Sequence, residues 1–176
     1  MNYAEIKTTD IANGEGVRTS LFVSGCRHHC KECFNEVTWD FGYGELFTEA
    51  TMEEIFDSVD HSWINGITIL GGEPFEPENQ RVLVPFLVMF REKFPDKNVW
   101  CYTGFTIEQI LGKSEPKSRA ATDISNEMLS LIDVLVDGPY VASMHDISLK
   151  FRGSSNQRVI DVKKSIDENK IVLYLD

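Results

Sequence analysis

The sequence predicts an α/β fold built on an open, mostly parallel sheet, and three observations support this. Short apolar runs rich in β-branched residues alternate with amphipathic stretches along nearly the whole chain, which is typical of repeated strand–helix units. The runs resemble strands that are buried on both faces of a parallel sheet. A closed eight-stranded barrel takes about 250 residues, so 176 residues favour an open, partial (β/α) barrel or an open sheet within one domain, residues 1–176.

Apolar runs predict the strands in chain order. The last run lies in the segment 163–176, which we expect to add a strand at the end of the chain. The expected strands are Thr19–Val23, Ile67–Leu70, Val99–Tyr102, Val134–Val136, Arg158–Val162 and Ile171–Leu175.

N-cap signatures predict where the helices between these strands begin. Thr51–Glu54 has the pattern of a capping box, and Thr106–Gln109 repeats it. A third helical stretch spans Glu78–Phe94, with Pro85 inside it, where we expect a kink or a restart. Ser125 is expected to cap a fourth helix.

Composition and charge exclude several classes of protein. The chain has 17 Lys and Arg against 28 Asp and Glu, a net charge of −11 and a pI near 4.8. A surface of this sign repels phosphate backbones and anionic lipids, so we expect neither nucleic acid nor a membrane as partner. No apolar run approaches the ~20 residues of a membrane span, and the first residues lack a signal peptide's apolar stretch. These patterns predict a cytoplasmic protein.

Three of the four cysteines lie close together in a CxxxCxxC loop, Cys26, Cys30 and Cys33, directly after the first expected strand. In a reducing cytoplasm such a cluster indicates metal or redox chemistry rather than a disulfide. Loops that follow parallel strands lie at the carboxyl edge of the sheet, where α/β proteins bind their ligands. Three thiolates leave one iron of a 4Fe-4S cluster open to an external ligand. The loop therefore predicts such a cluster.

A zinc site is the alternative for this loop. Zinc would need a fourth ligand, and His28 or His29 would have to supply it from the cramped span between the first two cysteines. The spacing favours iron and sulfide over zinc. Cys101 lies within an expected strand, where an isolated cysteine usually packs in the core as a small apolar residue.

A Gly-Gly-Glu-Pro motif, Gly71–Pro74, follows the second expected strand. Two glycines at a strand end allow a close approach of the backbone to a ligand, and the carboxylate of Glu73 could accept a hydrogen bond from a ligand ammonium group. By itself this motif is also an ordinary turn. Together with the cysteine loop it favours a binding site.

These motifs resemble those of the radical S-adenosylmethionine superfamily and, within it, the activating proteins of the anaerobic ribonucleoside-triphosphate reductase. The cysteine loop is typical of the superfamily, and the flanking motifs are typical of the family. The resemblance covers roughly residues 2–162. Its motifs are Asp10–Gly14, Leu21–Cys26, the cysteine loop with Phe34–Asn35, Thr38–Trp39, Gly71–Pro74, Trp100–Gly104, Val134–Gly138 and Phe151–Gln157.

The resemblance implies a radical S-adenosylmethionine type of partial barrel and assigns the cofactors to residues. Cys26, Cys30 and Cys33 would hold the 4Fe-4S cluster, and the amine and carboxylate of S-adenosylmethionine would chelate the fourth iron. Gly71, Gly72 and Glu73 would contact that methionyl group.

Further contacts with the nucleoside follow from the same resemblance. The backbone of Glu32, Cys33 and Phe34 would flank it, and Thr103 and Asp137 would contact the ribose or the methionyl end. Glu32 stands where superfamily members often have an aromatic residue and this family often has glycine, which argues against adenine stacking at that position. The segment 163–176 lies beyond the resemblance and could instead dock a partner.

The implied reaction is reductive cleavage of S-adenosylmethionine to methionine and a 5′-deoxyadenosyl radical. That radical would take a hydrogen atom from a backbone glycine of the reductase's large subunit, with a low-potential donor such as flavodoxin supplying the electron. No side chain is needed as a catalytic acid or base, because the cofactors carry the chemistry. His28 and His29 are accordingly expected to face solvent, unless one of them forms a hydrogen bond that tunes the cluster.

Three other functions remain open at this point. The chain could activate a different glycyl-radical enzyme, or it could be a radical enzyme that acts on a small pterin-like molecule without a protein partner. A zinc-binding interaction module without catalysis is the alternative from a different class of protein.

Overall fold

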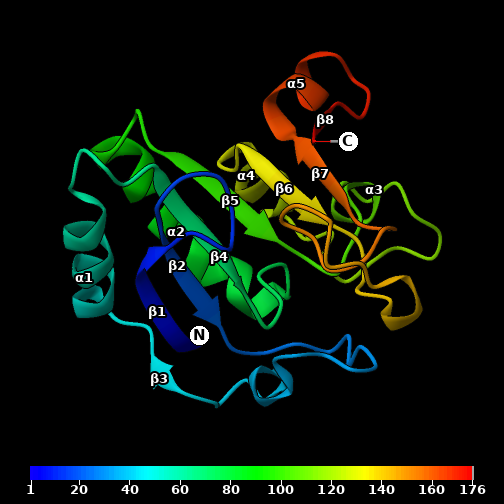
Figure 1. Cartoon of the computed structure of the whole chain (residues 1–176), viewed down its shortest axis with the longest axis horizontal. Coiled ribbons are helices and arrows are strands. Elements are labelled where there is room, and N and C mark those ends of the chain that lie inside the picture. The colour runs from blue at the N-terminus through cyan, green and yellow to red at the C-terminus, as the bar shows by residue number, and fades with distance from the viewer. Residues whose placement is uncertain (176) are drawn as a thin grey trace.

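The computed structural model describes residues 1–175 and contains an open eight-stranded sheet with helices packed against it (Figure 1). Asp176, the last residue of the expected 163–176 extension, lies outside the described residues. The strand order across the sheet is β3-β1-β2-β4-β5-β6-β7-β8. The strands are β1 (Asn2–Asp10), β2 (Arg18–Val23), β3 (Glu45–Leu46), β4 (Gly66–Gly71), β5 (Asn98–Tyr102), β6 (Val134–Asp137), β7 (Arg158–Asp161) and β8 (Leu173–Leu175).

The helices lie between these strands. None of the helices within residues 1–175 has the length and apolar character that crossing a membrane requires. The α-helices are α1 (Glu49–Val59), α2 (Pro77–Lys93), α3 (Ile107–Ile110), α4 (Ser125–Ser130) and α5 (Val162–Asp167), and two short 3₁₀ helices are η1 (Glu36–Trp39) and η2 (Ala142–Met144).

The sheet is mixed, so the expectation of a mostly parallel sheet was wrong. Its centre, β2-β4-β5-β6, is parallel, but β1 and β3 on one side and β7 and β8 on the other pair antiparallel. Parallel neighbours need a crossover, usually a helix, whereas antiparallel neighbours need none. The segment between β6 and β7 contains only η2, and this missing helix was the signal for an antiparallel pair.

The expected strands correspond to β2, β4, β5, β6, β7 and β8, but β1 and the two-residue β3 were missed. The sequence of β1 is largely polar, and most of its residues are exposed or half-buried. It therefore lacks the continuous apolar run by which the buried strands were recognised. The C-terminal segment forms α5 and then β8, which pairs with β7.

Helix starts were predicted with mixed success. The α3 capping box at Thr106 and Gln109 is confirmed. Helix α1 begins a turn earlier than expected, because Thr48 is its N-cap and Thr51 is the reciprocal member of the box. Ser125 is not an N-cap; its hydroxyl donates to the carbonyl of Ile110. The expected restart at Pro85 is absent, because α2 runs continuously through that residue.

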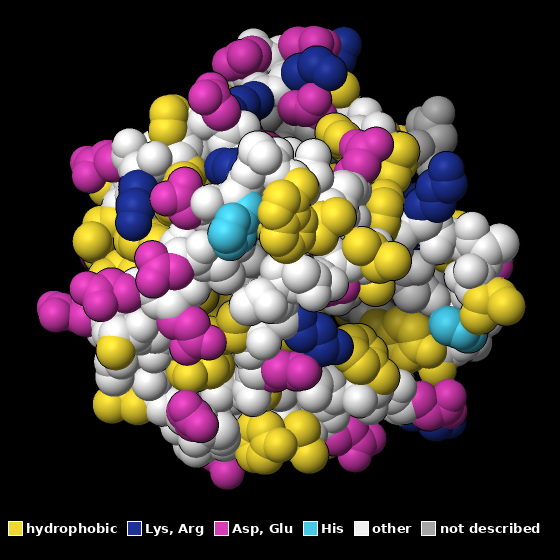
Figure 2. Space-filling model, turned by 60° about the vertical axis from the view of Figure 1, so that its left-hand side comes forward, with side chains coloured by type: hydrophobic (Ala, Val, Ile, Leu, Met, Phe, Trp, Pro, Cys, Tyr) yellow, Lys and Arg dark blue, Asp and Glu magenta, His cyan; other side chains and the backbone are white. Residues whose placement is uncertain are grey.

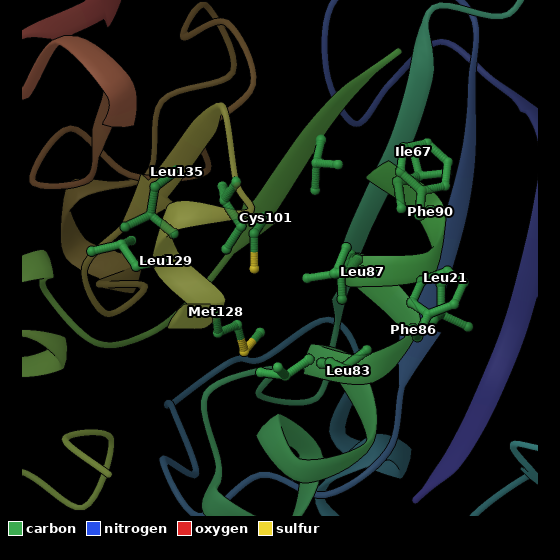
Figure 3. Packing of buried hydrophobic residues seen from close by; sticks show 14 of the residues in the cluster. Leu21, Ile67, Leu83, Phe86, Leu87, Phe90, Cys101, Met128, Leu129 and Leu135 are labelled. Atoms are coloured by element: carbon green, nitrogen blue, oxygen red, sulfur yellow. The ribbon is translucent and has the colours of Figure 1, made fainter. Parts of the chain in front are cut away.

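The main core lies between the sheet and helices α1, α2 and α4. Figure 3 shows Phe90 of α2 beside Ile67 of β4, with Leu87 of α2 in the same cluster. Cys101 of β5 is fully buried in this same cluster, beside Met128 of α4. Its expected role as a core residue is therefore confirmed.

The opposite face of the sheet carries a smaller cluster around Trp100 of β5. Phe151 and Tyr174 pack edge-on against the indole, with ring centroids 5.2 and 5.4 Å away. The guanidinium of the fully buried Arg18 lies 5.5 Å from the same ring and donates to the hydroxyl of Thr68 at 2.7 Å. The C-terminal strand β8 thus covers part of this second face of the sheet.

Replacing Tyr174 with alanine should lower the free energy of unfolding by about 1–2 kcal/mol, because it removes the aromatic contact with Trp100. The Tyr174 hydroxyl also donates to Glu15, but this bond is exposed to solvent, so its net contribution to stability is small. Tyr174→Phe, which keeps the ring, should therefore stay within about 0.5 kcal/mol of the original protein. Urea unfolding of the two variants checks this, and equal losses in both would contradict it.

The negative charge of the chain is dispersed rather than gathered. On the face drawn in Figure 2, Asp and Glu side chains are scattered among apolar and polar side chains. Several acidic residues elsewhere are neutralised by ion pairs with arginine, as Glu76 and Asp137 are. The face in that view therefore offers no single acidic patch to a partner.

Candidate functional site

Four loops meet at the carboxyl edge of the parallel strands, and the cysteine loop is one of them (Figure 1). The loop after β4 joins it through the N–H of Glu73, which donates to the carbonyl of Gly25 at 2.9 Å. The loop after β5 joins the one after β6, because Gly138 N–H donates to the carbonyl of Phe105 at 2.9 Å. The cysteine loop and the Gly-Gly-Glu-Pro motif therefore lie together at this edge of the sheet.

The first turn of the cysteine loop runs beside η1. Gly25 N–H donates to the carbonyl of Thr38 at 2.8 Å, and Cys26 N–H donates to the carbonyl of Trp39 at 3.2 Å. The buried amide of Asn79 in α2 donates to the carbonyl of Ser24 at 3.0 Å. The entry to the loop is thus held from both sides, by main-chain hydrogen bonds to η1 and by the side-chain amide of Asn79.

The two glycines of the motif are required by the contact between two backbones. Gly71 has φ +109°, a conformation that residues with a Cβ rarely adopt. A Cβ on Gly72 would lie 2.7 Å from the carbonyl oxygen of Gly25 and 2.9 Å from that of Thr38. The motif therefore packs against the start of the cysteine loop.

The side chain of Glu73 is fully buried and accepts four hydrogen bonds. One carboxylate oxygen accepts from the hydroxyl of Thr103 and from Phe75 N–H, both at 2.8 Å. The other accepts from Gly104 N–H at 2.8 Å and pairs with Nε2 of His28 at 2.9 Å. A carboxylate has about four acceptor positions, so these four bonds leave Glu73 none for a ligand ammonium.

A second buried carboxylate, Glu76, anchors the same loop. It accepts from the backbone N–H of Arg27 at 2.9 Å and from the Arg27 guanidinium at 2.7 Å. Arg119, from the loop before α4, donates to it at 3.0 Å. Burial opposes ionisation of Glu76, but the hydrogen bonds from Arg119 and Arg27 outweigh it and lower its pKa. The sequence interpretation missed this cluster, although Glu76 lies only three residues after Glu73.

All four cysteines are free thiols. Burial raises the pKa of Cys26 to about 12, although backbone N–H groups of His28 and His29 are directed at its sulfur. Burial also raises the pKa of Cys30, with a further contribution from the neighbouring Cys33. A nearby cation is what such buried thiolates need, since it offsets the cost of their charge.

The donor set of the loop fits a 4Fe-4S cluster. Within residues 1–175, no three His, Cys, Asp or Glu side chains converge on a point where they could share one ion. A zinc site needs that convergence, whereas a 4Fe-4S cluster takes each thiolate on a different iron. The three free thiols of the loop are the donor type that such a cluster takes.

The two loop histidines differ in their surroundings. His28 is packed, with a side chain only 16% exposed, so the expectation that it faces solvent was wrong. His29 is exposed as expected, although its ring stacks on Trp39 with centroids 4.5 Å apart. The loop has no regular secondary structure, so no periodicity indicated which of the two histidine side chains would be buried.

The residues expected to flank a nucleoside lie at the rim of the site. Glu32 is exposed and has φ +60°, and the side chain of Phe34 is 88% exposed. A shallow cavity is lined by Phe34 together with Phe22 and Lys7 of the neighbouring strands. This cavity adjoins the end of the cysteine loop.

Thr103 and Asp137 lie where expected, at or just past the ends of β5 and β6, but their side chains are bonded within the chain. Thr103 donates to Glu73. Asp137 is fully buried and accepts from Ile107 N–H at 2.8 Å and from Arg158 at 2.6 and 2.9 Å. Asp137 thereby connects the start of α3 to β7.

Arg158 also pairs with Glu108, which predicts a pH dependence of stability. Its hydrogen bonds lower the pKa of Glu108 from 4.5 to about 2. The pair therefore stabilises the fold fully above pH 4.5 and loses this contribution as the pH falls toward 2. Because the Glu108 side chain is 43% exposed, solvent screening reduces the contribution to about 1 kcal/mol.

Urea unfolding at pH 6 and pH 3 measures this contribution. Between these two pH values the original protein should lose roughly half or more of this ~1 kcal/mol in addition to what Glu108→Gln loses. All other acidic groups are common to both proteins, so the difference isolates Glu108. Equal losses would show that the pair contributes nothing to stability.

Comparison with known proteins gives one consistent family. Over residues 12–160 the chain matches the family described as a 4Fe-4S single cluster domain. It is 39% identical over 159 residues to the anaerobic ribonucleoside-triphosphate reductase-activating protein of Haemophilus influenzae, covering 89% of this chain and 96% of the relative. Proteins of the same name from Escherichia coli (37% over 161 residues; 90% and 97% covered) and Enterobacteria phage T4 (36% over 159 residues; 90% and 93%) are also similar.

Proposed function

The chain belongs to the family of anaerobic ribonucleoside-triphosphate reductase-activating proteins, and from this premise we propose which of its residues carry the activity. The protein is an iron–sulfur enzyme that activates the reductase by generating a glycyl radical, with a 4Fe-4S cluster and S-adenosylmethionine as cofactors. The observation that carries the assignment of residues is the loop of three free thiols, held against the Gly-Gly-Glu-Pro motif.

We assign the cluster to Cys26, Cys30 and Cys33, which leaves one iron for S-adenosylmethionine. When bound, these cofactors supply a low-potential electron and the radical chemistry that removes a hydrogen atom from glycine. The protein's own task is to hold the three thiolates apart, to orient the ligand and to exclude water. No side chain is assigned as an acid or base.

The S-adenosylmethionine contacts are proposed to be largely main-chain. Gly71 and Gly72 expose backbone at the strand end, and Glu73 contributes its backbone, because its carboxylate is already saturated. The backbone of residues 32–34 is proposed to flank the nucleoside beside the shallow cavity at Phe34. Thr103 and Asp137 act there through the loops that their side chains hold in place.

We further propose that the sheet is a partial barrel of the radical S-adenosylmethionine type, within a single domain. Its support is the open sheet, with β3 and β8 at its edges and the cysteine loop at the carboxyl ends of the central strands. An open mouth of this kind admits a segment of another protein, such as the glycine-bearing part of the reductase's large subunit. The electron is proposed to come from a low-potential donor such as flavodoxin.

Electron paramagnetic resonance tests this function. The protein, reconstituted without oxygen, is mixed with the large subunit of the reductase, S-adenosylmethionine and a reductant. We expect a carbon-centred doublet on the reductase, which requires every one of these components. Cleavage of S-adenosylmethionine without a radical on the reductase would point to a different glycyl-radical enzyme or to a small-molecule substrate. Protein without iron after reconstitution would overturn the assignment altogether.

A further inference from the structure

The span between the first two cysteines has an unfavourable backbone of its own. His29 has φ +50° and Glu32, further along the loop, has φ +60°, and residues other than glycine adopt this left-handed region at a cost of about 1 kcal/mol each. The span contains no helix or strand. Contacts from outside the loop must therefore hold it in place.

His28 supplies such a contact from the middle of the span. Its Nε2 lies 2.9 Å from the Glu73 carboxylate, whose other donors are Thr103, Gly104 and Phe75. His28 is the only one of these four donors that belongs to the cysteine loop. Because an ionised carboxylate only accepts, Nε2 carries the proton in this contact. The pair thus ties the cysteine loop to the segment that follows β4 and, through the other donors of Glu73, to the segment that follows β5.

The surroundings of the ring are shaped for an imidazole. The His28 ring meets Phe105 edge-on, with centroids 4.3 Å apart. On another side it lies over Gly104, where a Cβ would come within 2.7 Å of its Cδ2 atom. A hydrogen-bond acceptor, an apolar wall and a position without a side chain thus converge on one ring. This fit goes beyond incidental packing of a loop residue.

The position of His28 bears directly on the first cysteine. Backbone N–H groups of His28 and His29 are directed at the sulfur of Cys26. Displacement of the His28 ring would also move these N–H groups. The sulfur of Cys26, a residue that is only 8% exposed, would then become accessible to solvent. The ring therefore acts on Cys26 through the backbone.

We propose that His28 is a positioning residue, which, through its hydrogen bond to Glu73, fixes the cysteine loop in the conformation that receives the cluster. The part of this proposal that concerns the cluster rests on the proposed function. The part that concerns the loop does not, and it can be measured on the protein without iron.

The test is alkylation of Cys26 in the iron-free protein, followed by mass spectrometry of the Cys26 peptide. His28→Leu keeps apolar contact with Phe105 but loses the hydrogen bond, and it should raise the rate of Cys26 labelling about tenfold or more. His28→Gln, whose amide can still donate to Glu73, should remain within about threefold of the original protein. His61→Leu, at a histidine stacked on Trp63 away from the site, is the matched control and should change nothing.

Cys101, fully buried in the core, reports global unfolding in the same experiment. If His28→Leu also exposes Cys101, the test uses Gly104→Ala instead. The Cβ of that variant displaces the His28 ring, while His28 itself and the cysteines remain. If Cys26 is labelled at the original rate in His28→Leu, or in Gly104→Ala where that variant has replaced it, the proposal is overturned. Equal acceleration by His28→Leu and His28→Gln also overturns it, because the ring would then act by packing alone.

Reconstitution provides the second arm. His28→Leu should retain less iron, with an altered electron paramagnetic resonance spectrum of the reduced cluster, and His28→Gln should restore both. An original protein that binds no iron, combined with the expected alkylation rates, would refute the proposed function and leave the anchoring of the loop intact. Iron content and a spectrum in His28→Leu that match the original protein would overturn the role of His28 toward the cluster.

Discussion

Replacing Cys30 with alanine is expected to reduce the iron retained after reconstitution from about four per chain to background, and to abolish cleavage of S-adenosylmethionine. Cys30 is the middle ligand of the proposed three, and Cys33 N–H donates to its carbonyl in the turn that joins the two. Two thiolates cannot hold three irons of the cluster. Iron and sulfide analysis with an activity assay under anaerobic conditions measures both losses.

Cys101→Ala is the matched control, because it also removes one thiol. Cys101 is buried among apolar side chains in the main core, so its loss should cost about 1 kcal/mol of stability and leave iron binding unchanged. Full iron content and cleavage in Cys30→Ala would reject the assignment of the site. Loss of iron in Cys101→Ala at intact stability would reject the assignment of Cys101 to the core.

Replacing Gly71 with alanine is expected to lower the free energy of unfolding by about 3 kcal/mol or more. Its φ of +109° is strained for alanine, and its Cβ would lie 2.7 Å from the backbone nitrogen and oxygen of Val23. Strain of 1–3 kcal/mol at such a residue adds to a similar cost of overpacking. Neither neighbouring atom can move aside, because Val23 is paired with Gly71 in the sheet.

Gly42→Ala is the control for this variant. Gly42 does not have a positive φ, and the nearest atom to its Cβ is the Asp40 carboxylate oxygen at 3.4 Å. Its replacement should stay within about 0.5 kcal/mol of the original protein. Urea unfolding compares the two, and a Gly71→Ala protein as stable as Gly42→Ala would contradict the backbone contact on which the site depends.

The local sequence was sufficient for the central part of the fold. The strands β2, β4, β5 and β6 each contain a short apolar run, because both their faces are buried, and such runs are recognisable without a structure. The capping box of Thr106 and Gln109 was also recognisable, because both partners lie within one turn. The polar strand β1 was not recognisable, because it contains no apolar run of its own and its formation depends on pairing with β2.

The same distinction applies to the candidate site, where the local sequence predicts some features and only the fold shows the others. The thiols and the Gly-Gly-Glu-Pro motif each lie within a few residues, so their chemistry could be predicted, and the family confirmed the cluster type. The partners of Glu73 and Asp137 come from other strands and helices. Nothing in the spacing indicated that these carboxylates would be saturated by the chain itself.

The sequence by itself determined the central strands, the core role of Cys101 and the set of three thiols, because each depends on residue type and short-range spacing. Only the tertiary structure decided that the sheet is mixed, that Gly72 is pressed against the carbonyl of Gly25, and that His28 is bound to Glu73. The physical reason is the separation along the chain of the residues that each feature depends on. Apolar periodicity and metal-ligand spacing act along the chain, whereas the neutralisation of buried charge depends on segments that meet only after folding.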